Sequence, residues 1–317
     1  MSSDGGQSEI FAPGLLAGRV ALVTGGGTGL GKATALELAR CGATVTIAGR
    51  RAEVLEEAVA EARDAGLEGL DWVAGDVREP SEAGRLIETV LERRGRLDVL
   101  VNNAGGQYFT PAELIAEKGW RAVWRLNVEG MLNMAEAAYE LAFGPAGGAR
   151  MPHDGEDGEV PAGLPRNESP PGGTIVNVTL SPHHGMPGMA HSGAARATVE
   201  ALTRELAERW RDAGVCVTAV AAGHFETEVL AKYPASVRAG TARSIPLQRM
   251  GTPAEHAWLV TLLASPLGRA FNGSTVTLDG ARDNWAGAWP PPGLADEAGE
   301  VPVEERGAAR RAGAKDA

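Results

Sequence analysis

A glycine-rich segment between an apolar run and a helical pattern is the clearest sign of chemistry in this chain. It reads Thr24-Gly-Gly-Gly-Thr-Gly-Leu-Gly31. Glycines let a backbone approach a pyrophosphate closely, and the helix that follows supplies oriented N–H groups and a partial positive charge. The segment therefore predicts a dinucleotide site, although a plain turn between a strand and a helix would have similar glycines. The residues predicted to contact the dinucleotide are Gly25, Thr28, Gly29, Leu30 and Gly31.

Two arginines follow the second apolar run and bear on which dinucleotide is bound. Arg50 and Arg51 stand where a cofactor with a free ribose 2′-hydroxyl favours an Asp or Glu. A carboxylate would repel a 2′-phosphate, whereas a guanidinium pairs with one in a bidentate manner. The sequence therefore predicts NADP(H) rather than NAD(H). The alternative is that both arginines open the next helix on its solvent face.

The composition argues against several other classes of function. The formal net charge is -11, and binding a nucleic acid needs a clustered excess of Lys and Arg. No stretch reaches the roughly 18 apolar residues of a membrane span, and the polar N-terminus lacks the order of a signal peptide. The two cysteines lie far apart and suggest no disulfide, so we expect a cytoplasmic protein. His183, His184 and His191 have no acidic residue or cysteine at ligand spacing, and no metal site is predicted.

Runs of Val and Ile alternate with longer segments of helical period from residue 19 onward. This alternation is typical of parallel strands joined by crossover helices. The predicted strands cover residues 19–24, 43–48, 70–74, 97–102, 174–178, 215–220 and 274–278. We therefore expect an α/β fold with a Rossmann-type, doubly wound, seven-stranded parallel sheet and helices on both faces.

One domain, residues 15–285, is expected to bind the cofactor and to carry the catalytic groups. An N-terminal arm, 1–14, precedes it, and a flexible tail, 286–317, follows it. Segment 144–173 is rich in glycine, proline and acidic residues, a composition too poor in apolar groups to offset the entropy lost on ordering. It is predicted to be a flexible insertion ahead of the fifth strand.

Over residues 15–285 the sequence resembles the short-chain dehydrogenase/reductase family. The glycine segment, Gly75-Asp-Val77, Asn102-Asn-Ala-Gly105 and Leu126-Asn-Val128 occur in the order typical of that family. The resemblance implies that Asp76 and Val77 contact the adenine and that Asn127 takes part in a proton relay. It also implies a homodimer or homotetramer. The further cofactor contacts that it implies are Asn103, Ala104, Gly105, Arg196 and Gly223.

The catalytic pair typical of that family is absent from this chain. Most members use Tyr-x-x-x-Lys, in which the tyrosine gives its proton to a developing alkoxide and the ammonium group lowers the tyrosine pKa. The corresponding residues here are Ser192 and Arg196, and no lysine lies between residues 118 and 232. The family's upstream serine is represented by Thr179 or Ser181, on either side of an apolar residue. The usual carbonyl mechanism is therefore not expected.

One branch of the family, the peroxisomal trans-2-enoyl-CoA reductases, resembles the sequence more closely, and the 2,4-dienoyl-CoA reductases are a step further away. The resemblance rests on Ala12–Leu16, Val101–Gln107, Thr110–Glu113, His191–Ala197 and Asp283–Trp285. It implies reduction of the activated C=C bond of an enoyl thioester. Hydride addition to the β-carbon makes an enolate, which needs hydrogen-bond donors at the carbonyl oxygen, while the last proton can come from water.

The residues predicted to serve this chemistry are few. Arg196 cannot act as a base in practice and would keep a positive charge near the nicotinamide ribose. Two alternatives stay open: a carbonyl or alcohol oxidoreductase with a substitute acid such as Tyr108 or His224, and a catalytically silent protein that binds a nucleotide and serves a partner. The candidate donors to the carbonyl oxygen are Gln107, Tyr108, Asn127, Ser181 and Ser192.

Overall fold

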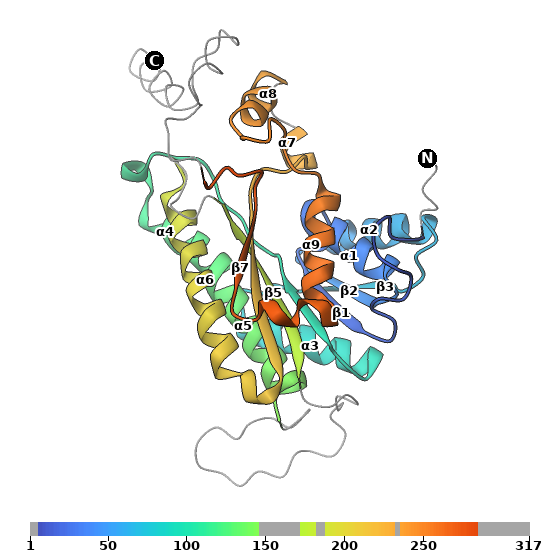
Figure 1. The fold of residues 1–317 in the computed structure, drawn as a ribbon. Helices are drawn as coiled ribbons and strands as arrows, with labels where there is room; N and C mark the ends of the chain where they lie inside the picture. Colours follow the sequence, from blue (N-terminus) through green and yellow to red (C-terminus); the bar gives the residue numbers. More distant parts are fainter. Residues whose placement is uncertain (1–5, 146–171, 182–187, 232–234, 285–317) are drawn as a thin grey trace, which may run out of the picture.

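A computed structural model describes residues 6–145, 172–181, 188–231 and 235–284. The strands form one sheet in the order β3-β2-β1-β4-β5-β6-β7, and every neighbouring pair is parallel (Figure 1). The strands are β1 Val20–Thr24, β2 Thr44–Gly49, β3 Leu70–Ala74, β4 Val99–Asn102, β5 Gly173–Leu180, β6 Val215–Ala222 and β7 Thr275–Leu278. The predicted α/β fold with a Rossmann-type, seven-stranded parallel sheet is confirmed.

The observed strands differ from the predicted ones by at most two residues, at the start of β4 and at the carboxyl ends of β5 and β6. The sequence predicts ends at residues 178 and 220, but the ladder continues through the pairs Thr179–Ala221 and Leu180–Ala222. The backbones still pair there although the Val-rich side-chain pattern has stopped. β5 also begins at Gly173, the last residue of the predicted insertion. Residues 146–171 of that insertion lie outside the described ranges, as do 1–5 of the arm and the whole tail.

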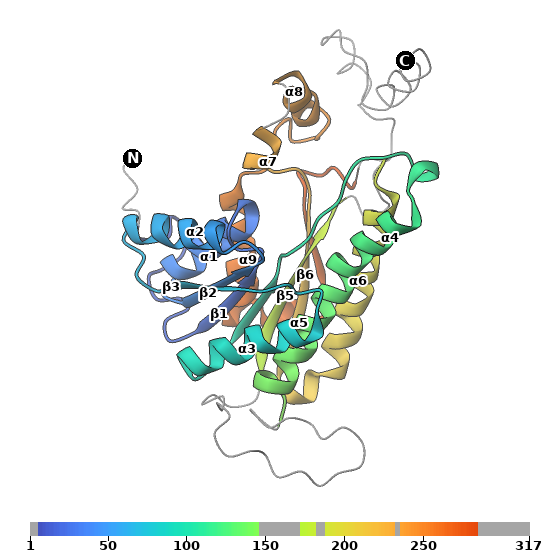
Figure 2. The same cartoon turned by 180° about the vertical axis from the view of Figure 1, so that it is seen from behind.

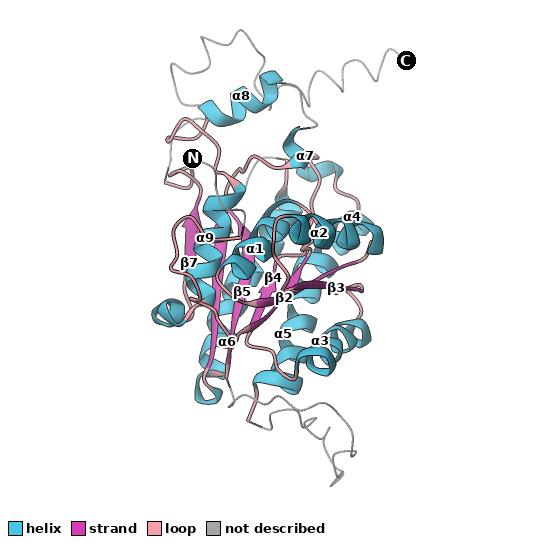
Figure 3. Cartoon of the chain, turned by 90° about the vertical axis from the view of Figure 1, so that its right-hand side faces the viewer, coloured by secondary structure: helices cyan, strands magenta, loops and turns pink. Residues whose placement is uncertain are grey.

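Helices cover both faces of the sheet (Figure 2). Apolar side chains of α1 Gly29–Arg40, α2 Ala52–Asp64 and α9 Pro253–Ala264 form the core on one face. Those of α3 Pro80–Arg94, α5 Gly130–Ala138 and α6 Ala190–Arg209 form the core on the other. α4 Glu117–Trp124 precedes α5, while α7 Glu228–Ala231 and α8 Ala235–Arg243 lie beyond the carboxyl ends of the strands (Figure 3). Across the described ranges, no helix combines the length and the apolar character needed to cross a membrane.

The carboxyl ends of β1 and β4 meet where the direction of strand addition reverses. β2 and β3 lie on one side of β1, and β4 to β7 lie on the other. In open α/β sheets, ligands bind in the crevice at such a point. The glycine segment follows β1 and the Asn102–Gly105 segment follows β4, so the fold brings these two predicted cofactor segments together.

A buried histidine between α1 and α9 makes folding stability depend on pH. Nδ1 of His256 lies 3.3 Å from the Thr34 hydroxyl, and its ring meets Phe225 edge-on at 5.7 Å between centroids. Burial lowers the pKa of His256 from 6.5 to about 4. Between those pH values the unfolded chain binds a proton that the folded chain does not. The free energy of unfolding therefore falls as the pH drops from 6.5 toward 4.

His256→Gln is expected to weaken this pH dependence, because it removes the group that titrates differently in the two states. One histidine contributes at most about 1.4 kcal/mol per pH unit. Urea unfolding measured above pH 7 and at about pH 5 gives the loss of stability for the variant and for the natural chain. An equal loss in both would assign the pH dependence to other groups.

Candidate functional site

The glycine segment folds into a turn in which particular glycines are required by geometry. Gly25 and Gly29 have φ values of 65° and 54°, a region that other residues rarely adopt. A Cβ atom on Gly31 would overlap the carbonyl oxygen of Gly25 and Nδ2 of Asn103. Thr28 is the N-cap residue of α1, and Leu30 lies in its first turn. The backbone is thus packed closely at the start of α1, as the predicted dinucleotide site requires.

Asn103 and Thr24 fasten this turn to the loop after β4. Nδ2 of Asn103 donates to the carbonyl oxygens of Thr24, at 3.0 Å, and Gly25, at 3.3 Å. The Thr24 hydroxyl donates to the Val101 carbonyl at 3.2 Å and accepts from the N–H groups of Asn103 and Ala104, both at 3.0 Å. Sequence reasoning assigned no role to Thr24. The available signal was a hydroxyl at the end of an apolar strand, directly before the glycines.

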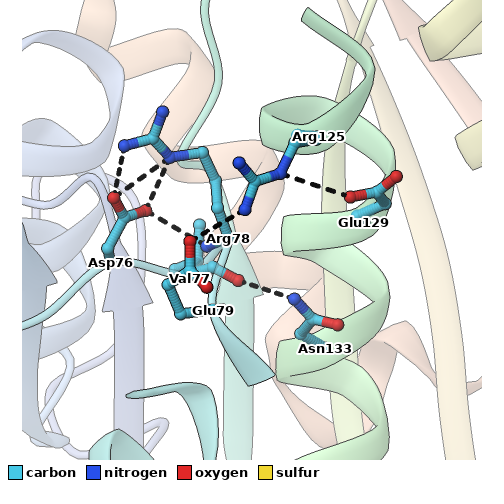
Figure 4. Close-up of polar contacts among 7 residues, drawn as sticks. All are labelled: Asp76, Val77, Arg78, Glu79, Arg125, Glu129 and Asn133. Atoms are coloured by element: carbon cyan, nitrogen blue, oxygen red, sulfur yellow. Dashed lines mark hydrogen bonds and ion pairs between the residues drawn. The ribbon is translucent and has the colours of Figure 1, made fainter. Parts of the chain in front are cut away.

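Asp76, predicted to contact the adenine, is held by an arginine two residues further on. Nε of Arg78 donates to the two carboxylate oxygens of Asp76 at 2.9 and 3.0 Å, and the Arg78 N–H donates to Oδ1 at 3.1 Å (Figure 4). These hydrogen bonds lower the pKa of Asp76, and the charge of Arg50 lowers it further. Asp76 is therefore ionised at neutral pH. Arg50 lies within electrostatic reach of it, and both Arg50 and Arg51 are exposed.

Hydrogen bonds join the segment after Asp76 to α5 and to the helical turn that precedes it. The Val77 carbonyl accepts from Nδ2 of Asn133 in α5 at 3.0 Å, and the Glu79 carboxylate accepts from Arg125 at 2.8 Å (Figure 4). Arg125 begins a π-helical turn, Arg125–Glu129, that joins α4 to α5. π-Helical turns occur frequently at functional sites. The segment predicted to contact the adenine is thus connected through side chains to the helices that carry predicted catalytic residues.

Asn127 lies in this π-helical turn and is 2% exposed. Its Nδ2 donates to the carbonyl of Gly106 at 2.9 Å and to that of Val123 at 2.7 Å, and its Oδ1 accepts from the Gly106 N–H at 3.1 Å. The side-chain amide is therefore used to hold the backbone at Gly106. Asn127 is predicted to donate a hydrogen bond to the substrate, but in the structure its amide nitrogen already donates to the carbonyls of Gly106 and Val123.

Ser192 and Arg196 occupy one helix, α6, where the family has its tyrosine and lysine. Ser192 is fully buried, and its hydroxyl has no hydrogen-bond partner in the part of the chain that is described. Nη1 of Arg196 donates to the Val178 carbonyl at 2.6 Å. A Cβ on Gly105 would overlap Nη2 of Arg196 and would lie 2.9 Å from Oδ1 of Asn127, so these groups meet at one point. Burial lowers the pKa of Arg196 to about 10, which leaves a cation at neutral pH.

The two candidates for the upstream serine point to different partners. The Thr179 hydroxyl donates to Glu200 of α6 at 3.0 Å, whereas the Ser181 hydroxyl donates to the carboxylate of Asp279, beyond β7. Ser181 is buried at the carboxyl edge of the sheet. Gly223 packs against Asp279 so closely that a Cβ there would lie 2.6 Å from the Asp279 Cβ. Ser181 and Gly223 are thereby brought together through Asp279.

The remaining candidates differ in their exposure. Gln107 is exposed, and Tyr108 is 43% exposed with its hydroxyl against Gly119 of α4. His224 is partly buried: burial and the charge of Arg282 lower its pKa to about 4, while Asp279 acts in the opposite direction. His183 and His184 lie outside the described residues.

Two models of known families match this chain. Residues 19–149 match the model described as short chain dehydrogenase, and residues 164–281 match the one described as Enoyl-(Acyl carrier protein) reductase. A peroxisomal 2,4-dienoyl-CoA reductase of Arabidopsis thaliana is 32% identical over 85% of this chain and 86% of its own length. A probable 2,4-dienoyl-CoA reductase of Bacillus subtilis is 33% identical over 86% of this chain and 98% of its own.

Among solved structures, the chain is similar to a citronellol catabolism dehydrogenase of Pseudomonas aeruginosa. The two are 36% identical with a TM-score of 0.70, over 86% of this chain and 98% of the other. The sheet order, the glycine turn and this likeness define an oxidoreductase of the doubly wound α/β class. The chain belongs to the short-chain dehydrogenase family. Its 2,4-dienoyl-CoA reductase relatives are consistent with an enoyl-CoA reductase-like activity.

Proposed function

We propose that this protein uses NADP(H) to reduce the activated C=C bond of an enoyl thioester. The observation that carries the proposal is the pair on α6: a buried serine hydroxyl, without a partner among the described residues, stands in place of the tyrosine, and a buried guanidinium stands in place of the lysine. A hydroxyl of ordinary acidity is a poor acid for an alkoxide but an adequate hydrogen-bond donor to an enolate oxygen.

The nicotinamide cofactor, held by the glycine turn and the loop after β4, supplies hydride when bound. Ser192 donates a hydrogen bond to the thioester oxygen as negative charge develops there, and the Arg196 cation adds to the positive potential. Asn127 keeps the Gly106 backbone fixed beside them. The proton that completes the product goes to carbon, and water supplies it.

Both substitute acids considered for a carbonyl mechanism are poorly suited to it. His224, with a pKa of about 4, carries no extra proton at neutral pH. The Tyr108 hydroxyl lies against Gly119 of α4, while its ring contacts His191. His224 therefore has no proton to give at neutral pH, and the Tyr108 hydroxyl is packed against α4, so neither arrangement suits general acid catalysis.

The test compares two substrate panels with purified protein and NADPH. We expect oxidation of NADPH with crotonyl-type thioesters and little with ketones. Ser192→Ala should lower kcat on the thioester roughly 10- to 100-fold without changing NADPH affinity. Ready reduction of ketones with untouched thioesters would contradict the proposal. NADPH binding without turnover of either panel would instead favour the catalytically silent partner protein.

The preference for NADP(H) is supported by the two exposed arginines after β2. Replacing both Arg50 and Arg51 by alanine removes the partners of a 2′-phosphate, so we expect KM for NADPH to rise roughly 10- to 100-fold. KM for NADH, which lacks that phosphate, should stay near its original value. An equal change for both cofactors would remove the argument for NADP(H).

A basic hollow beside the site supports a carrier that bears phosphates. It is an open hollow of about 530 Å³; Lys118 and Arg121 of α4 lie on its wall, and Arg121 is also paired with Glu117. We expect Lys118→Glu with Arg121→Glu to raise KM for a coenzyme A thioester roughly tenfold. The thioester of N-acetylcysteamine has no phosphate and serves as the control, because its KM should not change. The full lining is Arg78, Glu117, Lys118, Arg121, Ala122 and Arg125.

Two further expectations stay predictions. The resemblance to the family supports a homodimer or homotetramer, which sedimentation can measure. A cytoplasmic location rests on sequence features alone, and several similar proteins are described as peroxisomal.

A further inference from the structure

Two adjacent polar side chains at the start of α6 are buried without hydrogen-bond partners. His191 is 1% exposed and Ser192 is 0% exposed. Within the described part of the chain, neither ring nitrogen of His191 nor the Ser192 hydroxyl has a partner. A buried polar group left unpaired destabilises the fold, because it has lost its hydrogen bonds to water. Two such groups at consecutive positions of α6 each need a partner, which a bound ligand would provide.

The imidazole of His191 is held between two aromatic side chains. The Tyr108 ring meets it edge-on at 4.5 Å between centroids, and the Trp120 ring of α4 does so at 6.0 Å. The loop that carries Tyr108 is itself fixed to the entry of α6, because the Thr110 N–H donates to the Gly188 carbonyl at 2.8 Å. The ring is therefore positioned by packing alone, with its nitrogens left for another molecule.

Electrostatics keep this imidazole neutral. Burial lowers the pKa of His191 below its usual value of 6.5. The N-terminus of α6 carries a partial positive charge, and no side chain caps it. The same helix end favours negative charge on a ligand placed next to it. A neutral imidazole always has one N–H to donate.

We propose that His191 donates a second hydrogen bond, beside that of Ser192, to the substrate oxygen that becomes negative during reduction. For the identity of that oxygen, a thioester carbonyl, the inference rests on the proposed function. The imidazole keeps its proton throughout, so no proton is gained or lost at His191. Its role is that of an oxyanion donor in a dry environment, where such donors are most effective.

The test uses three substitutions in the full chain. His191→Phe keeps a ring between Tyr108 and Trp120 but removes both nitrogens, and we expect kcat to fall about 100-fold with NADPH affinity unchanged. His191→Asn and His191→Gln place an amide donor near Nδ1 or Nε2. One of them should recover at least about tenfold of that loss and so identify the donating nitrogen. His256→Phe is the matched control, because His256 is also buried with an unpaired Nε2 but lies between α1 and α9.

The outcomes separate this inference from the proposed function. The natural chain's activity on thioesters and on ketones decides the substrate class, and the His191 variants are then measured on the class that is reduced. An unchanged kcat in His191→Phe would overturn the role of His191, and so would an equal loss in all three variants. A drop in His256→Phe as large as that in His191→Phe would do the same. No turnover of either class by the natural chain would overturn both.

Discussion

Gly31→Ala is expected to abolish tight cofactor binding. The new Cβ would overlap the Gly25 carbonyl oxygen and Nδ2 of Asn103, the two groups whose hydrogen bond joins the glycine turn to the loop after β4. One overlapped atom belongs to the backbone, so rotating a side chain cannot relieve the clash and the turn has to move. A misplacement of about 1 Å can cost on the order of 100-fold. We therefore expect the Kd for NADPH, measured by fluorescence titration, to rise about 100-fold or more.

Gly84→Ala makes the same chemical change where space is available. Gly84 lies in α3, and a Cβ there would have no atom within 4 Å. This control should bind NADPH like the natural chain and gain about 0.5–1 kcal/mol of stability, because alanine favours a helix more than glycine does. If Gly31→Ala bound NADPH as tightly as Gly84→Ala, the glycine turn would not be the cofactor site.

Arg196→Met is expected to separate activity from stability. The guanidinium lies where Gly105 and Asn127 meet, and the substitution removes a buried cation while filling a similar volume. Keeping a charge out of water costs free energy, so its removal offsets the loss of the hydrogen bond that Arg196 donates to the Val178 carbonyl. We therefore expect Tm to change little, while kcat/KM on an enoyl thioester falls about 100- to 1,000-fold through lost electrostatic stabilisation.

Arg204→Met provides the control for this experiment. Arg204 is two turns further along α6 and is exposed. Its substitution should leave kcat/KM and Tm close to those of the natural chain. A comparable loss in both variants would mean that the charge of the whole helix, rather than the enclosed guanidinium, supports turnover. Measuring kcat/KM at high and at low salt would distinguish the two cases, because salt strongly screens only the exposed charges.

The local pattern of residue types was sufficient to predict much of the fold. Strands buried on both faces read as continuous Val and Ile runs, so the sheet could be predicted without knowing what covers it. The glycine turn could also be predicted, because close backbone packing requires glycines, and these can be recognised in the sequence. The ends of β5 and β6 could not be, since pairing there depends on two backbones in register rather than on side-chain pattern.

Hydrogen bonds between segments that are far apart in the chain could not be predicted from the sequence. The Thr24 hydroxyl meets residues after β4, and the Ser181 hydroxyl meets Asp279 beyond β7. Nothing local to either residue encodes those contacts. The role proposed for His191 shows the same limit, because it depends on contacts with the rings of Tyr108 and Trp120 and on two ring nitrogens that have no partner within the described residues.

The hydrogen bonds between the Asn127 amide and Gly106 divide the loop after β4 into a part that is held in place and a part that is exposed. The amide binds both the N–H and the carbonyl of Gly106, which belong to successive peptide groups, while Gln107, Tyr108 and Phe109 directly beyond are exposed. We therefore expect substitutions at Gln107 or Phe109 to change the exposed surface beyond Gly106 and to leave the predicted cofactor contacts before it in place. Tyr108 differs from these two residues, because its ring also contacts His191.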